Sequence, residues 1–355
     1  MQATTPTKIK VLFFSFVGEN YSRSSTILHA ETQDIDKKFI KLPIGIVNST
    51  RLIRKMKRDL KSADYLVVMS PCHILTPILK LLSNKRVILD AGWALTDGQL
   101  SRGQILRKGI KLLQSYLIDL LAFHTADIVI LESEIQRHRT SRMFFLPRSK
   151  IRVNFTGLDE SAYSGTNQHS EKIAKLDESL QLLGFNTKVL FRGKVNNESG
   201  IQNILDAASL LEKKVSFILV CGKRDQFFGL PSNVILLTDL TNDELRAVYQ
   251  RAHIALGQIS KHSRLNYTIP HKAFEAGFFS KVYITSNMRA IRELYSPNSI
   301  SLIDDISGVA LAAEIERFSN PIHRTELEKH ISNDYKKRAS QENLSKNFEK
   351  IIQGL

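Results

Sequence analysis

Short apolar runs alternate with amphipathic segments along the first 160 residues. The runs are predicted as buried strands, since each is roughly four to eight residues long and rich in branched and aromatic side chains. They cover residues 10–17, 39–42, 64–69, 86–89, 126–131 and 150–153. Apolar residues recur at helical spacing in the segments 24–31, 51–61, 75–82 and 106–124. Strands that alternate with helices predict a largely parallel sheet with helices on both faces.

The same alternation begins again after a polar stretch. Residues 163–181 show no strand pattern and are interpreted as part of a connection between two domains. Further strands are expected at 188–191, 215–221, 234–237, 254–256 and 281–285, and helices at 200–211, 242–251 and 270–279. We therefore predict an α/β fold of two Rossmann-like domains that face each other across a cleft. The expected bounds are 1–160 and 188–325, with the connection at 161–187 and one or two terminal helices at 326–355.

Length and composition are those of a globular chain. Its 355 residues, 43% of them apolar, are enough for two cores. Cys72 and Cys221 are far apart and form no Cys-x-x-Cys spacing, so disulfide and zinc interpretations have little support and a reducing compartment is expected. The apolar run 11–17 is too short to cross a bilayer. Because the chain shows no credible signal peptide or membrane helix, we expect it to be cytoplasmic.

The formal net charge of +15 is explained in part by two basic segments in the N-terminal half. Residues 51–61 hold six basic side chains and one acidic side chain, and on a helix the basic and apolar positions would lie on different faces. Residues 102–123 lead from a basic start into an apolar run. Basic amphipathic segments are attracted to anionic lipid, so an anionic membrane surface is an expected partner. The alternative is a pair of solvated helix faces.

Residues 265–285 carry the strongest chemical signal. Pro270 suits the first turn of a helix, because its missing N–H would have no partner there. The amides of His271 and Lys272, together with the helix dipole and the lysine charge, favour an anion at that end. Glu275 lies one turn farther on, within reach of a hydroxyl group. A phosphate site beside a carboxylate suits a nucleotide-sugar; the alternative is an ordinary helix between two strands.

This segment resembles the donor-binding segment of GT-B glycosyltransferases of the large family 4. There a Pro-x-Lys-x-x-Glu helix precedes a strand, and this pattern is present at 270–275. The resemblance implies that Glu275 contacts the donor's ribose. The family's other glutamate, which precedes this one with seven residues between them in a Glu-x7-Glu pair, falls at Tyr267. The resemblance covers most of residues 185–300 and implies that the last helix crosses back to the N-terminal domain.

The loop that follows the first strand of the second domain is basic. It contains Arg192, Gly193 and Lys194. It resembles the family's loop in which two cations hold the donor diphosphate, with Lys194 in the arginine position and Ser199 in the lysine position. Gly193 allows a close approach of the backbone. The resemblance thus implies a donor site made of this loop and of the helix start described above; the alternative is a basic turn.

In the first domain, candidate residues follow the strands, because open α/β sheets bind ligands at the carboxyl ends of their strands. The loop after the first strand contains Gly18 and Asn20, which the resemblance places on the acceptor side. His73 and Asp90 follow the next strands and are the candidate catalytic residues, since family members often carry a histidine in such a loop. Trp93 is placed to stack on an acceptor sugar or to lie in the core.

These features together predict a glycosyltransferase. It would move a sugar from a nucleoside diphosphate donor to a hydroxyl of a glycan or lipid-linked acceptor, in bacterial surface polysaccharide or glycolipid assembly. The resemblance implies retention of the anomeric configuration with neither a metal nor a cofactor. The segment Asp34-Ile-Asp36 has the form of a metal signature but is interpreted as a loop. The chain contains no Gly-x-Gly-x-x-Gly, which argues against a nicotinamide enzyme.

Three alternatives stay open. A sugar-nucleotide epimerase shares the two-domain plan, although its cleft usually holds more carboxylates and histidines. An inactive relative that acts as a partner subunit would account for Tyr267 and Ser199. A nucleic-acid-binding protein would use the positive charge, yet the chain shows neither aromatic-basic interleaving nor a helix-turn-helix pattern, so no nucleic acid is expected as a partner.

Overall fold

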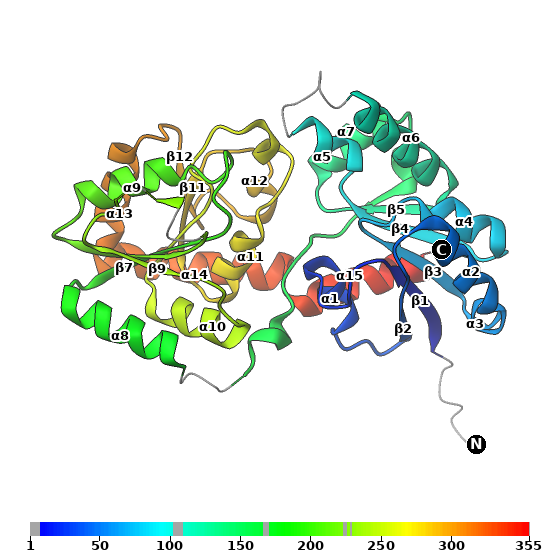
Figure 1. Ribbon diagram of the computed structural model, residues 1–355, viewed down its shortest axis with the longest axis horizontal. Helices are drawn as coiled ribbons and strands as arrows, with labels where there is room; N and C mark the ends of the chain where they lie inside the picture. The colour runs from blue at the N-terminus through cyan, green and yellow to red at the C-terminus, as the bar shows by residue number, and fades with distance from the viewer. Residues whose placement is uncertain (1–7, 102–108, 166–169, 223–225, 228, 355) are drawn as a thin grey trace. The chain divides into compact units, whose positions relative to one another are not determined.

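Two compact units make up the chain (Figure 1). The structure, a computed structural model, describes residues 8–101, 109–165, 170–222, 226–227 and 229–354. The first unit consists of Met1–Asp159 with Gln341–Leu355, and the second of Glu160–Ser340. Each unit is built on a six-stranded parallel sheet. The predicted α/β architecture of two Rossmann-like domains is therefore confirmed.

The sheet of the first unit has the strand order β2-β1-β3-β4-β5-β6, and every neighbouring pair is parallel. The strands are β1 (Ile9–Ser15), β2 (Ile35–Lys41), β3 (Tyr65–Met69), β4 (Arg86–Gly92), β5 (Ile128–Leu131) and β6 (Ile151–Val153). Their near-continuous apolar sequences follow from this arrangement, because a parallel sheet is covered on both faces. The strand order reverses between β1 and β3.

Two cores lie on the two faces of this sheet, because successive side chains of a strand point to opposite sides. Leu12 and Phe14 belong to one core, and Val11 and Phe13 to the other. Side chains of α2 (Ile46–Lys55), α4 (Leu75–Leu82) and α6 (Gly109–Thr125) pack on the first core. Side chains of α1 (Ser22–Leu28) and α15 (Gln341–Gln353) pack on the second.

The last helix, α15, completes the first unit. The ring of Phe348 lies 5.8 Å from that of Phe13, and the Gln341 amide donates to the carbonyl oxygen of Thr26 at 3.2 Å. The preceding helix, α14 (Pro321–Arg338), belongs to the second unit. The terminal segment expected at 326–355 is thus divided at residue 340 between the two units.

The remaining helices of the first unit are α3 (Lys57–Ser62), α5 (Leu95–Leu100) and α7 (Glu134–Met143). The sequence pattern did not predict α5 or α7. The interpretation of Asp34-Ile-Asp36 as a loop was also wrong. Strand β2 begins at Ile35, which is buried and pairs in register with Ile9. Arg102, Arg107 and Lys108, which were expected to attract lipid, lie outside the described residues.

The sheet of the second unit has the strand order β12-β11-β10-β7-β8-β9. Its strands are β7 (Thr187–Arg192), β8 (Val215–Val220), β9 (Val234–Leu237), β10 (Ile254–Leu256), β11 (Val282–Ser286) and β12 (Ser301–Ile303). The sequence predicted no strand after 281–285, but β12 pairs with β11 beyond these residues. β12 has only three residues and begins with a serine, so its apolar run is too short to be predicted as a strand.

The helices of the second unit are α8 (Glu171–Leu183), α9 (Ile201–Leu210), α10 (Asn242–Arg251), α11 (His271–Phe278), α12 (Ile291–Leu294), α13 (Gly308–Ser319) and α14. The segment interpreted as a connection contains α8. A capping box closes the start of α10, where Thr241 and Glu244 exchange hydrogen bonds between side chain and backbone. None of the described helices has both the length and the apolar composition needed to cross a bilayer.

Candidate anion site in the second unit

The reversal of strand order in the second unit lies between β7 and β10. In open α/β sheets, ligands bind outside the carboxyl ends of the strands at such a reversal. Here β7 ends at Arg192 and β10 ends at Leu256, so the loops that follow these strands flank the expected site. The predicted donor-binding residues of the 192–194 loop begin at this edge of the sheet.

Helix α11 brings a free helix start to the same edge. It begins at His271, with Pro270 as the N-cap residue in an extended conformation, one position outside the first turn where the sequence had placed it. Neither the His271 amide nor the Lys272 amide has a hydrogen-bond acceptor among the described residues. Two unpaired amides at the positive end of a helix can bind an anion.

Glu275 is the centre of a buried polar cluster. Its side chain is 0% exposed, and four groups contact its two carboxylate oxygens. Arg192 Nη1 lies 3.0 Å and His271 Nδ1 lies 3.2 Å from Oε1. The hydroxyl groups of Tyr163 and Tyr249 donate to Oε1 and Oε2, at 3.3 and 2.8 Å.

The charge of Glu275 is maintained by these partners. Burial by itself raises the pKa of a carboxyl group, but the Arg192 charge and the hydrogen bonds from His271 and Tyr249 outweigh burial and lower the pKa of Glu275 to about 2. Arg192 shows the matching effect, since the Glu275 charge raises the guanidinium pKa. The ion pair therefore stays charged across the neutral range. It fixes Arg192, whose side chain is 35% exposed, at the carboxyl edge of the sheet.

Lys272 is buried beside this cluster. Its Nζ atom donates to Gln258 Oε1 at 3.2 Å and lies 3.9 Å from the centre of the Phe191 ring. Burial lowers the pKa of Lys272 to about 7, although the nearby Glu275 charge acts in the opposite direction. An ammonium group with one neutral oxygen partner is poorly compensated for burial. A bound anion would supply the missing charge.

Gly193 allows the Lys272 side chain to reach this position. Its φ angle is +149°, and an added Cβ would lie 3.0 Å from Lys272 Nζ. We expect Gly193→Ala to lower the free energy of unfolding by about 1–3 kcal/mol and to weaken anion binding, because it adds backbone strain and displaces the lysine. Urea denaturation and anion titration measure the two effects.

Gly184→Ala is the matched control for this substitution. Gly184 has a φ angle of +68°, but the nearest atom to an added Cβ is a backbone oxygen at 4.0 Å. This variant adds strain without crowding a lysine, so it should lower stability and leave anion binding unchanged. Equal weakening of anion binding in both variants would contradict the role given to Gly193.

The loop from Gly193 to Gly200 closes on itself. The Asn196 side chain accepts hydrogen bonds from the amides of Glu198 and Ser199, both at 3.0 Å. Ser199 is buried and donates to the Asn196 carbonyl oxygen at 2.6 Å. At the position where the family carries a lysine, this chain therefore has a side chain that stabilises the loop. Lys194 is exposed at the start of the same loop.

Several residues of this site were not found from the sequence. Tyr163 and Gln258 give no motif of their own, and Tyr163 is 112 residues away from the carboxylate it contacts. Arg264 was also missed; its guanidinium pairs with Glu198 at 3.1 Å and adds a further cation to the 193–200 loop. A tyrosine on a helix gives no sign in the sequence that its hydroxyl faces a buried charge.

The candidate residues of the first unit lie partly in loops after the strands and partly inside the sheet. Gly18 and Asn20 lie in the loop after β1, where Asn20 is exposed, and Trp93 follows β4 and is half-buried. Asp90 does not follow a strand as predicted but lies within β4, where it pairs in register with Met69 and Ile130. The strand continues past residue 89 because β5 still offers hydrogen-bond partners there.

The two candidate catalytic residues are enclosed in the first unit. Asp90 accepts hydrogen bonds from the buried Arg23 at 2.5 and 2.8 Å. Burial raises the pKa of Asp90, and Arg23 opposes this shift. His73 is 0% exposed, with Nε2 3.9 Å from Asp119, and burial lowers its pKa. These contacts fit a structural role, and catalysis by either residue stays a prediction.

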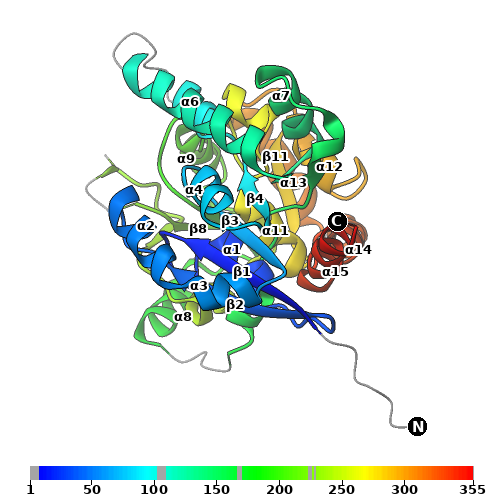
Figure 2. The same cartoon turned by 90° about the vertical axis from the view of Figure 1, so that its right-hand side faces the viewer.

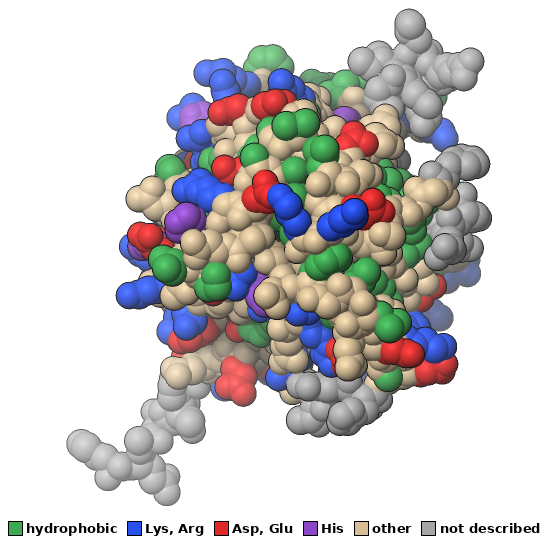
Figure 3. Space-filling model, turned by 90° about the vertical axis from the view of Figure 1, so that its left-hand side faces the viewer, with side chains coloured by type: hydrophobic (Ala, Val, Ile, Leu, Met, Phe, Trp, Pro, Cys, Tyr) green, Lys and Arg blue, Asp and Glu red, His purple; other side chains and the backbone are tan. Residues whose placement is uncertain are grey.

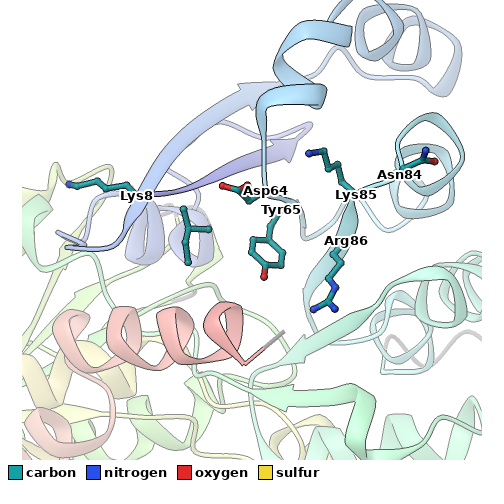
Figure 4. Close-up of a pocket in the computed structure, with 7 residues that line it drawn as sticks. Lys8, Asp64, Tyr65, Asn84, Lys85 and Arg86 are labelled. Carbon is teal, nitrogen blue, oxygen red and sulfur yellow. The ribbon is translucent and has the colours of Figure 1, made fainter. Parts of the chain in front are cut away.

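A pocket in the first unit lies at the opposite end of its strands (Figure 4). Its volume is about 550 Å³. Lys8, Asp64, Tyr65, Lys85 and Arg86 line it, near the amino ends of β1, β3 and β4. Because ligands of open α/β sheets bind at the carboxyl ends, this pocket is not part of the candidate site.

The fold is that of known GT-B proteins. The chain is similar to HepE from Anabaena, solved in complex with UDP-glucose, with a TM-score of 0.73 and 12% identity over 98% of this chain and 100% of that chain. It is similar to sucrose-phosphate synthase from Thermosynechococcus elongatus, with a TM-score of 0.65 and 12% identity over 98% and 99% of the two chains.

The same fold likeness extends to another class of protein. A protein from Listeria monocytogenes, provisionally assigned as a UDP-N-acetylglucosamine 2-epimerase, gives a TM-score of 0.58 and 11% identity over 98% of this chain and 97% of that chain. No protein-family model matches the sequence, and no curated protein matches it. At these identities the likeness shows the GT-B fold alone.

Proposed function

We propose that the chain is a glycosyltransferase that takes a sugar from a nucleoside diphosphate and transfers it to a hydroxyl group. The observation that carries this proposal is the arrangement of Arg192, Lys272 and the start of α11 at the strand-order reversal of the second unit. A GT-B protein solved with UDP-glucose supports the choice of a nucleotide-sugar as donor.

The chemistry required is stabilisation of a leaving diphosphate. When the bond between the anomeric carbon and the phosphate oxygen breaks, negative charge increases on the diphosphate. Arg192, Lys272, the exposed Lys194 and the two free amides of α11 would stabilise that charge, and groups already in place do so without reorganisation. The acceptor hydroxyl attacks the anomeric carbon and gives its proton to an oxygen of the leaving diphosphate. By the resemblance, the configuration at that carbon is retained and neither metal nor cofactor takes part.

Glu275 is a positioning residue in this proposal. The resemblance gives it a direct contact with the donor's ribose, whereas its enclosed carboxylate already has four partners in this structure. We therefore assign it the task of holding Arg192 and His271 at the edge of the sheet. Contact with the ribose would require one of these partners to move.

The acceptor belongs on the first unit. Asn20 and Trp93, with Gly18 in the same loop as Asn20, lie at the carboxyl ends of β1 and β4. By the resemblance these loops meet the acceptor, and the basic segments of this unit suit an acceptor held at an anionic membrane. We propose a lipid-linked glycan of bacterial surface polysaccharide or glycolipid assembly as the acceptor class, with the protein on the inner face of the membrane.

A thermal-shift series of nucleoside diphosphates and their sugars tests the donor site. We expect one nucleoside diphosphate to raise the melting temperature of the wild-type chain. Glu178→Gln, which changes an exposed carboxylate on α8, should respond equally, and Glu275→Gln should respond far less. Lack of stabilisation by any nucleoside diphosphate would favour an inactive partner subunit.

Release of the nucleoside diphosphate then separates the two enzymatic possibilities. A glycosyltransferase should release it from the stabilising sugar-nucleotide only slowly until a hydroxyl acceptor is added. Release or sugar isomerisation at full rate without an acceptor would contradict the proposal and favour an epimerase.

A further inference from the structure

Helix α6 exposes an apolar stripe on the first unit. Ile110, Leu113, Leu117 and Leu121 are 77%, 58%, 53% and 50% exposed. Their spacing of three, four and four residues places them on one face of the helix. A contiguous exposed apolar face is uncommon on a soluble protein surface and marks an interaction site.

Further apolar side chains extend this surface across neighbouring helices. Figure 2 shows α2, α4 and α6 side by side on one face of the first unit, and α4 contacts both of the others. On α4, Leu81 is 86% exposed, and at the start of α2 Ile46 and Val47 are 49% and 72% exposed.

Phe145 adds an aromatic ring beside α6. It is 83% exposed, and the ring of its neighbour Phe144 stacks on Tyr116 of α6 at 5.1 Å. Phe145 also has a φ angle of +54°, a conformation that costs a bulky residue free energy. This left-handed residue ends α7, since the following amide, that of Leu146, donates to the carbonyl oxygen of Ser141 at 3.0 Å.

The Asp, Glu, Lys and Arg side chains exposed on α2, α4 and α6 are all basic. Exposed basic side chains occupy α2 and α3, namely Arg51, Arg54, Lys55, Lys57, Arg58 and Lys61, and Lys111 is exposed on α6. The sequences of α2 and α4 contain no carboxylate, and the single one in α6, Asp119, is buried. Asp59 of α3 is paired with Lys38 at 2.7 Å.

The second unit has no comparable surface among its described residues. Its exposed large apolar residues, Leu182, Leu210, Val309 and Ile322, belong to four different helices. Figure 3 shows small apolar groups on this side of the molecule, separated by basic, acidic and polar side chains. The stripe is therefore a property of the first unit and not of the surface in general.

We propose that the α2–α4–α6 face docks on an anionic lipid bilayer, with the α6 stripe and Phe145 entering the headgroup region. An apolar stripe beside unpaired cations, with no exposed carboxylate on α2, α4 or α6, is complementary to anionic headgroups over an apolar layer. The docking does not depend on glycosyl transfer, because it uses no residue of the second unit.

Co-sedimentation of the full chain with vesicles tests this surface. Wild type should bind vesicles of phosphatidylcholine with one quarter phosphatidylglycerol, and bind vesicles of phosphatidylcholine alone at least tenfold more weakly. The double variant Leu113→Gln/Leu117→Gln should lose at least tenfold in binding to the anionic vesicles. Arg51→Glu/Arg54→Glu should also bind more weakly than wild type, and the difference should grow as the fraction of anionic lipid in the vesicles rises.

Leu182→Gln/Leu210→Gln is the matched control, since it makes the same change at two leucines of the second unit that are 83% and 57% exposed. It should bind anionic vesicles as wild type does, and all variants should keep the thermal shift given by the nucleoside diphosphate. Failure of wild type to bind anionic vesicles would overturn the proposal. An equal loss of vesicle binding in the control variant would also overturn it. A third contrary result would be a dimeric wild type that Leu113→Gln/Leu117→Gln converts to a monomer in light scattering.

Discussion

Glu275→Gln is expected to reduce kcat/KM for the sugar-nucleotide by about 100-fold or more, the size of effect that misplacement of a binding group by about 1 Å produces. The carboxylate is fully buried and contacts Arg192 and His271 through one oxygen. An amide cannot balance the guanidinium charge, so Arg192 would turn toward water. Because Arg192 would meet the donor diphosphate, both binding and transfer should suffer.

The same variant should be less stable. Removal of one partner from a buried ion pair costs about 3–5 kcal/mol, since the other charge is left uncompensated; the 35% exposure of Arg192 puts the expected loss toward the lower end. The pKa of Glu275 is lowered to about 2 from its ordinary 4.5. Its contribution is therefore present above pH 4.5 and is lost as the pH falls toward 2.

Two measurements check this first result. Glu178→Gln, the exposed control on α8, should match wild type in kcat/KM and in urea denaturation. Wild type should lose more stability than Glu275→Gln when the pH falls from 4.5 to 2. An unchanged kcat/KM in Glu275→Gln, with a normal urea midpoint, would contradict the role of the cluster.

Binding of the nucleoside diphosphate is expected to weaken as the pH rises from 7 to 9. Lys272 has a pKa of about 7 in the free protein, and a phosphate beside it would raise that value. Above pH 7 the bound state thus holds a proton that the free state lacks, so affinity falls by up to about tenfold per pH unit. The terminal phosphate, with a pKa of about 6, is already ionised in this range.

Lys272→Met should remove this pH dependence. It should also weaken binding at pH 7 by about 10- to 100-fold, the range for one charge-assisted hydrogen bond. The nearby Cys221 thiol stays protonated through pH 9, because burial raises its pKa to about 11. Lys213→Met, which changes an exposed lysine before β8, is the control and should keep the wild-type slope in calorimetric titrations. A wild-type slope in Lys272→Met would assign the titration to another group.

Much of the fold could be predicted because the strands are short apolar runs separated by amphipathic helices. The predicted bounds of α4, β9, α10 and β10 agree with the structure to the residue. The prediction failed for β12 and α5, where apolar runs are short, and for the division of 326–355 between the two units. That division depends on which core the residues of α15 enter, and helical periodicity alone does not identify the core.

The candidate anion site was predicted in part. Two local motifs identified Arg192, Lys272 and Glu275, because Arg192 ends a strand and the other two lie in the first half of a helix that begins at the same edge of the sheet. Their burial could not be read from the motifs. In α11, residues 272–277 are all buried, so a lysine and a glutamate that would be surface groups on most helices lie inside the second unit. Tyr163, whose hydroxyl group donates to Glu275, comes from a distant segment and was therefore missed.

The central claim is that the start of α11 and the Lys272 side chain hold the diphosphate of the donor. The most direct test is a crystal structure of the chain with the nucleoside diphosphate that gives the largest thermal shift. We expect phosphate oxygens within about 3 Å of Lys272 Nζ and of the His271 and Lys272 amides. A diphosphate bound elsewhere, for example between Lys8 and Lys85 at the amino ends of the first sheet, would contradict the account.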